Sequence, residues 1–113
     1  DARDAYTAKH SDRVADMVLV LATALDLSED ETTLLHMAAH LHDIGKIAVP
    51  DSVLRKAGPL TSPEWEEMRR HPVTGYEILR KVDDFKEIAV LVRHHHERWD
   101  GRGYPDGLRG ADI

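Results

Sequence analysis

The stretch HMAAHLHDIGK at residues 36–46 decides how the rest of the chain is interpreted. Apolar residues recur before and within it at helical spacing: Leu34, Ala38 and Leu41. This spacing places them on one face of a helix, which we expect to be buried. Ser28 and Glu31 form a capping-box pattern that predicts the start of the helix, and Gly45 predicts its end. The last turn of this helix therefore carries most of the polar chemistry of the stretch.

Two sets of polar residues in this stretch lead to different expectations. His36, His40 and Asp43 follow one another at i, i+4 and i+7, a spacing that can hold a metal ion. An ideal helical wheel places all three opposite the apolar face, so it predicts that they face solvent. His42 lies beside the apolar face, with Lys46 one turn later. The spacing leaves two roles open for His42: a core histidine bonded to a backbone carbonyl, or a functional residue.

A second histidine run, at residues 94–96, lies within a patterned helix. Its apolar residues are Phe85, Ile88, Leu91 and Val92. The wheel places His95 on this face and His96 beside it, whereas His94 points to the opposite side. Two adjacent buried imidazoles need polar partners, and a shared cation satisfies both. We therefore expect His10, His42, His95 and His96 to converge on a common site.

The sequence predicts an all-α fold, because apolar residues recur every three or four positions and never at every second position as in a strand. Helices are expected over about 7–27, 28–45, 61–71, 73–82 and 84–96, followed by a shaped loop rich in glycine and proline at 100–110. The buried face of the first helix is predicted to consist of Val14, Val18, Leu21, Ala22 and Leu25, with His10 one turn before it. A loop that contains Pro50 and the Gly58-Pro59 pair is expected to lead to Thr61-Ser-Pro-Glu64, which is typical of a helix start, and Pro72 is expected to end that helix at His71.

Composition narrows the class of protein. The 113 residues suffice for one domain, and 42% of them are apolar without any run of membrane-spanning length. There is no cysteine, so any metal must bind nitrogen and oxygen ligands, and a cytoplasmic location is expected. The net charge of −6 argues against binding to duplex nucleic acid. The chain contains eight histidines, an unusually high number for its length, which directs attention to sites built from imidazoles.

Four segments together carry a family resemblance. They are YTAKHSDRVA at 6–15, AAHLHDIGKIAVPDSVL at 38–54, MRRHPVTGYEIL at 68–79 and HHERWDGRGYPDGLRG at 95–110. In this combination the chain resembles the HD-GYP family, a branch of the HD-domain metal-dependent phosphohydrolases. The resemblance implies an HD-domain-like helical bundle with a centre of two or three metal ions, usually iron or manganese. It also implies hydrolysis of the bacterial messenger cyclic di-GMP to pGpG or GMP.

The resemblance assigns roles to particular positions of this chain. The implied metal ligands are His10, His42, Asp43, His71, His95 and His96, with Asp43 as the bridging carboxylate. The implied catalytic residues are Asp43 and Lys46, and the implied substrate-binding residues are Lys46, Asp100, Gly101, Gly103, Tyr104 and Pro105. The wheel and the resemblance disagree about Asp43; we follow the resemblance, because a helix that is ending need not keep ideal angles. The 100–105 loop could grip substrate, contact a partner domain, or orient His95 and His96.

Departures from the family pattern qualify these expectations. Tyr6 stands where some members carry a metal-binding Glu, which favours two metal ions, with zinc accepting the same ligands as iron and manganese. The family continues past the position of Ile113 into a helix with a final metal-binding Asp, and neither Asp106 nor Asp112 replaces it. Residues 1–113 are therefore expected to be a catalytic domain incomplete at its C-terminus, with an exposed apolar groove.

The sequence is compatible with two alternatives to a cyclic di-GMP phosphodiesterase. One is an HD-type phosphohydrolase that acts on another nucleotide, although the Gly-Tyr-Pro loop favours the first reading. The other is a non-catalytic signalling module that contacts receiver or GGDEF domains. A homodimer is compatible with each of them.

Overall fold

The computed structural model describes residues 2–113, and it describes side chains from residue 9 onward. The elements formed by residues 2–113 are helices joined by turns and loops, with no strand, which confirms the all-α prediction. The α-helices are α1 (Ala2–Ala24), α2 (Glu29–Leu41), α3 (Asp51–Leu54), α4 (Ser62–Met68), α5 (His71–Leu79) and α6 (Lys86–Arg93). Short 3₁₀ helices are η1 (Ile44–Ala48), η2 (Asp83–Phe85) and η3 (Gly110–Asp112). None of the described helices combines the length and the apolar character needed to cross a membrane.

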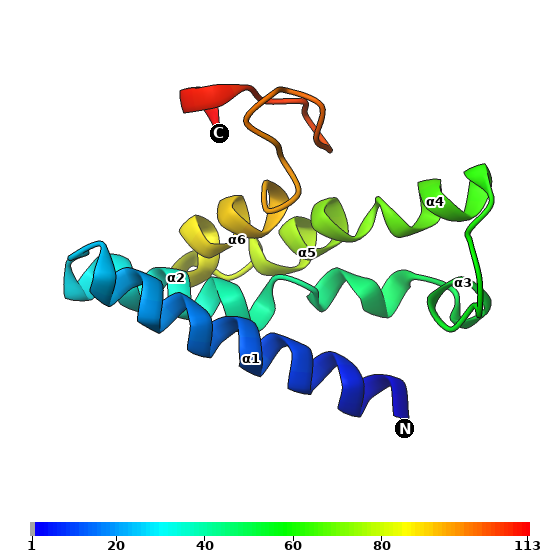
Figure 1. Ribbon diagram of the computed structural model, residues 1–113, viewed down its shortest axis with the longest axis horizontal. Helices are drawn as coiled ribbons and strands as arrows, with labels where there is room; N and C mark the ends of the chain where they lie inside the picture. The colour runs from blue at the N-terminus through cyan, green and yellow to red at the C-terminus, as the bar shows by residue number, and fades with distance from the viewer. Residues whose placement is uncertain (1) are drawn as a thin grey trace.

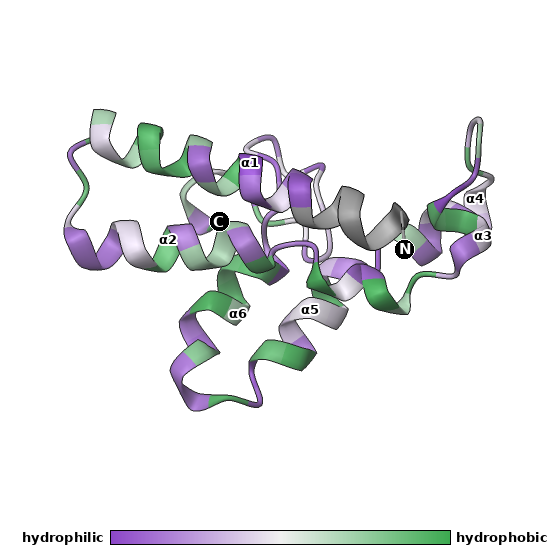
Figure 2. Ribbon diagram, turned by 90° about the horizontal axis from the view of Figure 1, so that it is seen from below, coloured by the Kyte–Doolittle hydropathy of each residue, from purple (hydrophilic) through white to green (hydrophobic). Residues whose placement is uncertain are grey.

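The helices pack as two pairs. α1 lies along α2, α5 lies along α6, and α2 also packs against α6 (Figure 1). The core forms where α2, α5 and α6 meet, from Ala38, Leu79, Ile88, Ala89 and Val92. Hydrophobic and hydrophilic segments alternate along α6 (Figure 2), as expected for a helix with one buried face. The loop after α6 returns across this bundle and ends at η3 (Figure 1).

Two helix starts follow the predicted capping chemistry. The Ser28 hydroxyl accepts the N–H of Glu31, while the Ser28 N–H donates to the Glu31 carboxylate at 3.2 Å. Thr61 and Glu64 repeat this exchange at the start of α4. Each pair satisfies backbone donors that a helix N-terminus otherwise leaves without partners.

The predicted buried face of the first helix is partly wrong. Ala22 is buried, and Val14 and Val18 are half-buried, but Leu21 and Leu25 are 57% and 69% exposed. Ser11 and Ala15 are buried instead. Small side chains on this face let α1 approach α2 closely, and the larger residues therefore lie on the outer side.

The predicted boundaries also shift at several places. The helix expected to reach residue 45 ends at Leu41 and is followed by η1, and residues 51–54, expected in a loop, form α3. His71 does not mark a break but begins α5, because Pro72 lies in the first turn, where its missing N–H has no intrahelical role. The last expected helix stops at Arg93, before the histidine run.

Candidate metal centre

The end of α2 turns Asp43 inward. His42 caps the helix, and Asp43 leaves helical geometry with φ −101° and ψ 11° before η1 begins. The carboxylate is consequently 4% exposed. The wheel-based expectation that Asp43 faces solvent is therefore wrong, since the wheel assumes an ideal helix at a position where the helix has already ended.

The two oxygens of Asp43 face two different groups of side chains. Around Oδ2 lie Lys46 Nζ at 3.2 Å, His42 Nε2 at 3.3 Å and His10 Nε2 at 3.6 Å. Around Oδ1 lie His71 Nε2 at 3.3 Å and His95 Nε2 at 3.8 Å. A carboxylate placed in this way can bridge two cations, one on each side.

The electrostatics of this centre favour an ionised carboxylate. Burial alone raises the pKa of Asp43, but hydrogen bonds from His42, His71 and His95 outweigh burial and hold that pKa well below its usual range. Burial likewise lowers the pKa of His42, whereas the hydrogen bonds with Asp43 and the Ala39 carbonyl raise it above its usual value. Both shifts show that the surroundings of Asp43 favour positive charge.

Three of the histidines are oriented by the ends of three different helices. The Nδ1 atoms donate to carbonyls three residues earlier in the chain: His42 to Ala39 at 2.6 Å, His71 to Met68 at 2.7 Å and His95 to Val92 at 2.6 Å. These carbonyls belong to the last turns of α2, α4 and α6, where backbone acceptors lack helical partners. A charged ring can also donate its Nε2 proton to Asp43, whereas a neutral ring keeps its proton on Nδ1 and directs the Nε2 lone pair into the centre, as metal-binding histidines do. The bond of His42 to a backbone carbonyl, one of the two roles that its spacing left open, is thus present, and its functional role stays a prediction.

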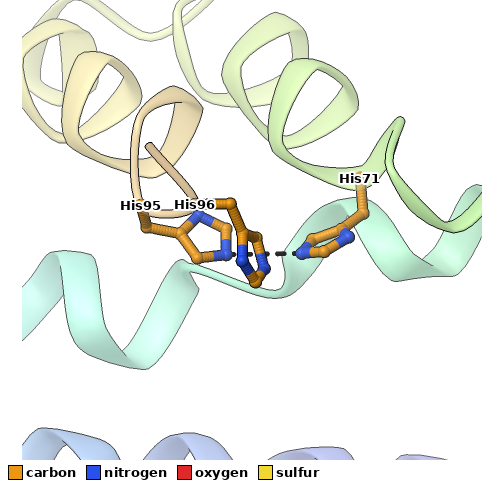
Figure 3. Close-up of side chains that lie close together, drawn as sticks. All are labelled: His71, His95 and His96. Atoms are coloured by element: carbon orange, nitrogen blue, oxygen red, sulfur yellow. Dashed lines mark hydrogen bonds between the residues drawn. The ribbon is translucent and has the colours of Figure 1, made fainter. Parts of the chain in front are cut away.

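The facing nitrogens of His71 and His95 fit a shared cation. Their Nε2 atoms lie 3.3 Å apart (Figure 3), although both Nδ1 protons are already donated to carbonyls. The dashed line in Figure 3 marks this contact as a hydrogen bond, so either a proton on one Nε2 or a cation bound by both satisfies the two nitrogens. Two imidazoles bound to one ion at about 2.1 Å each would have their nitrogens about 3.3 Å apart. The donor set of nitrogen and oxygen suits divalent iron, manganese or zinc.

The potential ligands form two neighbouring groups. His71, His95 and His96 make one, and His10, His42 and Asp43 make the other; within each group the ligand atoms lie within 4.8 Å of one another. These are the six positions that the sequence analysis predicted as ligands, and the fold brings them together around Asp43. Burial, together with the neighbouring His95 and His71, lowers the pKa of His96 to about 4, so its ring is neutral near pH 7 and able to bind a metal ion.

Lys46 lies at the open edge of this centre. Its ammonium donates to Asp43 Oδ2 at 3.2 Å, and its side chain remains 28% exposed. The 3₁₀ turn of η1 produces this contact, because it places residues 43 and 46 one turn apart on the same side. The ammonium can therefore contact both the buried carboxylate and an anion that arrives from solvent.

The histidines outside the predicted ligand set lie elsewhere. His40 is exposed and pairs with Asp12 at 3.2 Å, and the half-buried His36 packs its ring against that of His40. Exposure of His40 confirms its prediction, whereas His36 is less exposed than the wheel suggested. Tyr6, whose identity favours two metal ions over three, lies outside the residues whose side chains are described.

The loop after α6 is held by a residue that the sequence analysis missed. The Glu97 carboxylate is fully buried and accepts the backbone N–H groups of Asp106 and Leu108, each at 3.0 Å. His94 Nδ1 contacts the same carboxylate at 3.1 Å, and Arg93 makes two hydrogen bonds to Asp106. His94, Glu97 and Asp106 also lie close enough to hold an ion, but Arg93 already balances Asp106 and the backbone occupies Glu97. The only sequence feature that could have indicated this network is the position of the acidic Glu97 next to the glycine-rich loop.

The predicted substrate-binding residues of the loop differ in what they contact. Asp100 bonds to Arg98 and to the N–H of Arg102 within the loop. Gly103 passes so close to the backbone of residues 96–98 that a Cβ would lie 2.4 Å from the His96 carbonyl oxygen. Tyr104 stacks on the His96 ring at 4.9 Å with an interplanar angle of 14°. The other two, Gly101 with φ +80° and Pro105 after a cis peptide bond, form the turns of the loop.

An apolar groove borders the centre, as the sequence analysis expected. It has a volume of about 410 Å³ and reaches His42, His94 and His95. Its apolar lining comes from Val18, Leu35, Ala38, Ala39, Val90, Leu91 and Ile113. His42 and His95 are thus next to a surface that can accept a further apolar element.

The positions of His94 and His95 predict different effects of alanine substitution. His95→Ala removes a nitrogen that faces Asp43, so we expect the full-length protein to lose most of its bound metal and its turnover. His94→Ala leaves the centre intact but removes the contact with Glu97, so metal content should stay near that of the wild type. Elemental analysis of both purified variants measures this difference. Equal metal loss in both would contradict the geometry.

Comparison with known proteins shows which family the chain belongs to. The family model described as HD domain matches residues 2–113. Over 113 residues the chain is 48% identical to the cyclic di-GMP phosphodiesterase response regulator RpfG of Xanthomonas campestris, covering 98% of this chain and 30% of that protein. Over 114 residues it is 45% identical to the cyclic di-GMP phosphodiesterase PA4108 of Pseudomonas aeruginosa, covering 97% and 27%. A 3'3'-cGAMP-specific phosphodiesterase 2 of Vibrio cholerae is 44% identical over 118 residues, covering 100% and 22%. The chain thus spans less than a third of these relatives.

Proposed function

Because this chain belongs to the HD domain family, we propose that it carries the catalytic centre of a metal-dependent phosphodiesterase that hydrolyses cyclic di-GMP. The observation that supports this most strongly is the placement of Asp43, whose two oxygens face separate groups of imidazole nitrogens. This arrangement suits two divalent cations, which we propose to be iron or manganese, with zinc also compatible with the ligands. The names of the relatives support a cyclic dinucleotide as substrate.

Each residue then has a defined task. His10, His42, His71, His95 and His96 would hold the ions, with Asp43 between them. Two such ions supply Lewis acidity and an activated nucleophile for attack on phosphorus. Lys46 holds a nonbridging oxygen of the phosphodiester from the open edge and stabilises the charge that develops there. The Glu97 network keeps the loop folded, so that Tyr104 stays against His96.

The remaining parts of the proposal concern the whole protein. We propose that residues 1–113 belong to a single catalytic domain that acts in the cytoplasm and hydrolyses cyclic di-GMP to pGpG, GMP or both. Contact with receiver or GGDEF domains and formation of a homodimer stay predictions from the family resemblance. The apolar groove beside His95 provides one surface for such a contact.

Metal removal and replacement test the proposed function in the full-length protein. We expect dialysis against a chelator to abolish hydrolysis of cyclic di-GMP, and iron or manganese to restore it, because the metal ions supply the activated nucleophile. Product chromatography separates pGpG from GMP. Metal-replete protein that hydrolyses only other phosphoesters would support the alternative HD phosphohydrolase. Protein that binds no transition metal would support the non-catalytic module.

A further inference from the structure

A second recognition feature adjoins the metal centre on the side of α4. The guanidinium of Arg69 lies over the ring of Trp65 at 5.6 Å and over the ring of Tyr104 at 5.7 Å. Trp65 comes from α4, whereas Tyr104 comes from the loop after α6. The tertiary fold therefore brings together two aromatic rings and one cation from segments far apart in the sequence.

Arg69 differs from its neighbour in its ionic contacts. Arg70 forms an ion pair with Glu67 at 3.0 Å. Among the residues with described side chains, no carboxylate forms an ion pair with Arg69, although this chain carries an excess of acidic residues. Stacking on aromatic rings leaves the N–H groups at the edge of a guanidinium available for another acceptor.

The position of Arg69 connects this feature to the centre. Tyr104 stacks on His96, and Arg69 precedes the buried His71 by two residues. A dinucleotide with one phosphodiester at the metal centre would extend its bases over the neighbouring surface. The Trp65 ring, which is 45% exposed, lies on that surface.

We propose that Trp65, Arg69 and Tyr104 form a subsite for one guanine base of the substrate. The exposed Trp65 ring provides a stacking surface, as in proteins that bind unpaired bases, while Tyr104 lies between His96 and Arg69 and positions the guanidinium. The edge of the Arg69 guanidinium pairs with O6 and N7 of guanine, an arrangement that adenine cannot accept because its 6-amino group is a donor. This subsite deepens the proposed function and rests on it.

A base explains the feature better than a second phosphate does. A phosphate contact needs only the cation, and Lys46 already provides a cation beside Asp43. The exposed Trp65 ring and its stacking with Arg69 have no role in such a contact, whereas a stacked base uses both. The ligand chemistry assigned here is therefore a purine with two adjacent acceptors on its edge.

The test compares substrates in the full-length, metal-loaded protein. We expect Arg69→Ala to reduce the kcat/KM ratio of cyclic di-GMP over cyclic di-AMP by about 10- to 100-fold, the range typical for a bidentate contact with guanine. Arg69→Lys should not restore it, because an ammonium lacks the planar fork. Hydrolysis of bis(p-nitrophenyl) phosphate, which has no base, measures any effect of Arg69→Ala on the metal centre itself. Arg70→Ala is the matched control and should keep wild-type selectivity.

Binding to metal-free full-length protein provides a readout that needs no turnover. The wild type should bind cyclic di-GMP more tightly than cyclic di-AMP, and Arg69→Ala should remove this preference. Equal losses for both dinucleotides would indicate a phosphate contact, and unchanged selectivity would indicate a structural role; either result overturns the subsite. Wild-type protein that prefers cyclic di-GMP in binding yet hydrolyses no dinucleotide would overturn the proposed function alone.

Discussion

Asp43→Asn should abolish both metal binding and hydrolysis in the full-length protein. The substitution keeps the size of the side chain but removes the negative charge that faces Lys46 and the imidazole nitrogens on both sides. The neutral amide no longer balances the charge of the Lys46 ammonium, and it cannot bridge two cations as a carboxylate does. Loss of metal-supplied Lewis acidity costs several kcal/mol in the transition state, so we expect turnover to fall on the order of 10³-fold or more.

The matched control for this prediction is Asp12→Asn. Asp12 also pairs with a histidine, His40 at 3.2 Å, but this pair lies on the exposed surface. An exposed pair of this kind contributes little to stability, and its loss should leave metal content and turnover near wild-type values. Elemental analysis and the rate of cyclic di-GMP hydrolysis measure both variants. Metal content in Asp43→Asn that equals the wild type would contradict the bridging geometry.

Gly45→Ala should strongly destabilise the fold and displace the centre with it. A Cβ on Gly45 would lie 2.0 Å from the carbonyl oxygen of His71 and 2.7 Å from the backbone nitrogen of Gly75. These are backbone atoms of α5, so relief of the clash requires η1 to move away from α5, which separates Asp43 from His71. We expect the free energy of unfolding to drop by about 3 kcal/mol or more. Thermal unfolding of this domain should then shift downward by more than about 10 °C.

Gly75→Ala provides the graded comparison. Its Cβ would also meet a close neighbour, Val92 Cγ1 at 2.8 Å, but this atom belongs to a side chain. Repacking of a methyl group relieves part of the clash, so the loss of stability should be smaller, about 1–3 kcal/mol. An equal loss in the free energy of unfolding for both substitutions would show that the close approach of Gly45 to the α5 backbone is not what limits stability.

Gly45 also illustrates where local sequence patterns are insufficient. The glycine predicts the end of the α2 helix, but the helix ends four residues earlier and Gly45 lies inside η1. Its lack of a side chain is required by the close approach of α5, a contact between segments about 30 residues apart. Similarly, the apolar spacing of α1 predicted a buried face that includes Leu21 and Leu25, whereas packing against α2 buried the smaller Ser11 and Ala15.

The sequence by itself determined the all-α class, the capped starts of α2 and α4, and which residue types were available as ligands. These properties follow from periodicity and from side-chain chemistry, which act over a few residues. Only the tertiary structure decided that Asp43 turns inward, that three helix ends orient three imidazoles, and that Glu97 holds the loop against the centre. Those features depend on contacts between segments distant in the chain, and on helix ends that depart from ideal angles, so no local pattern encodes them.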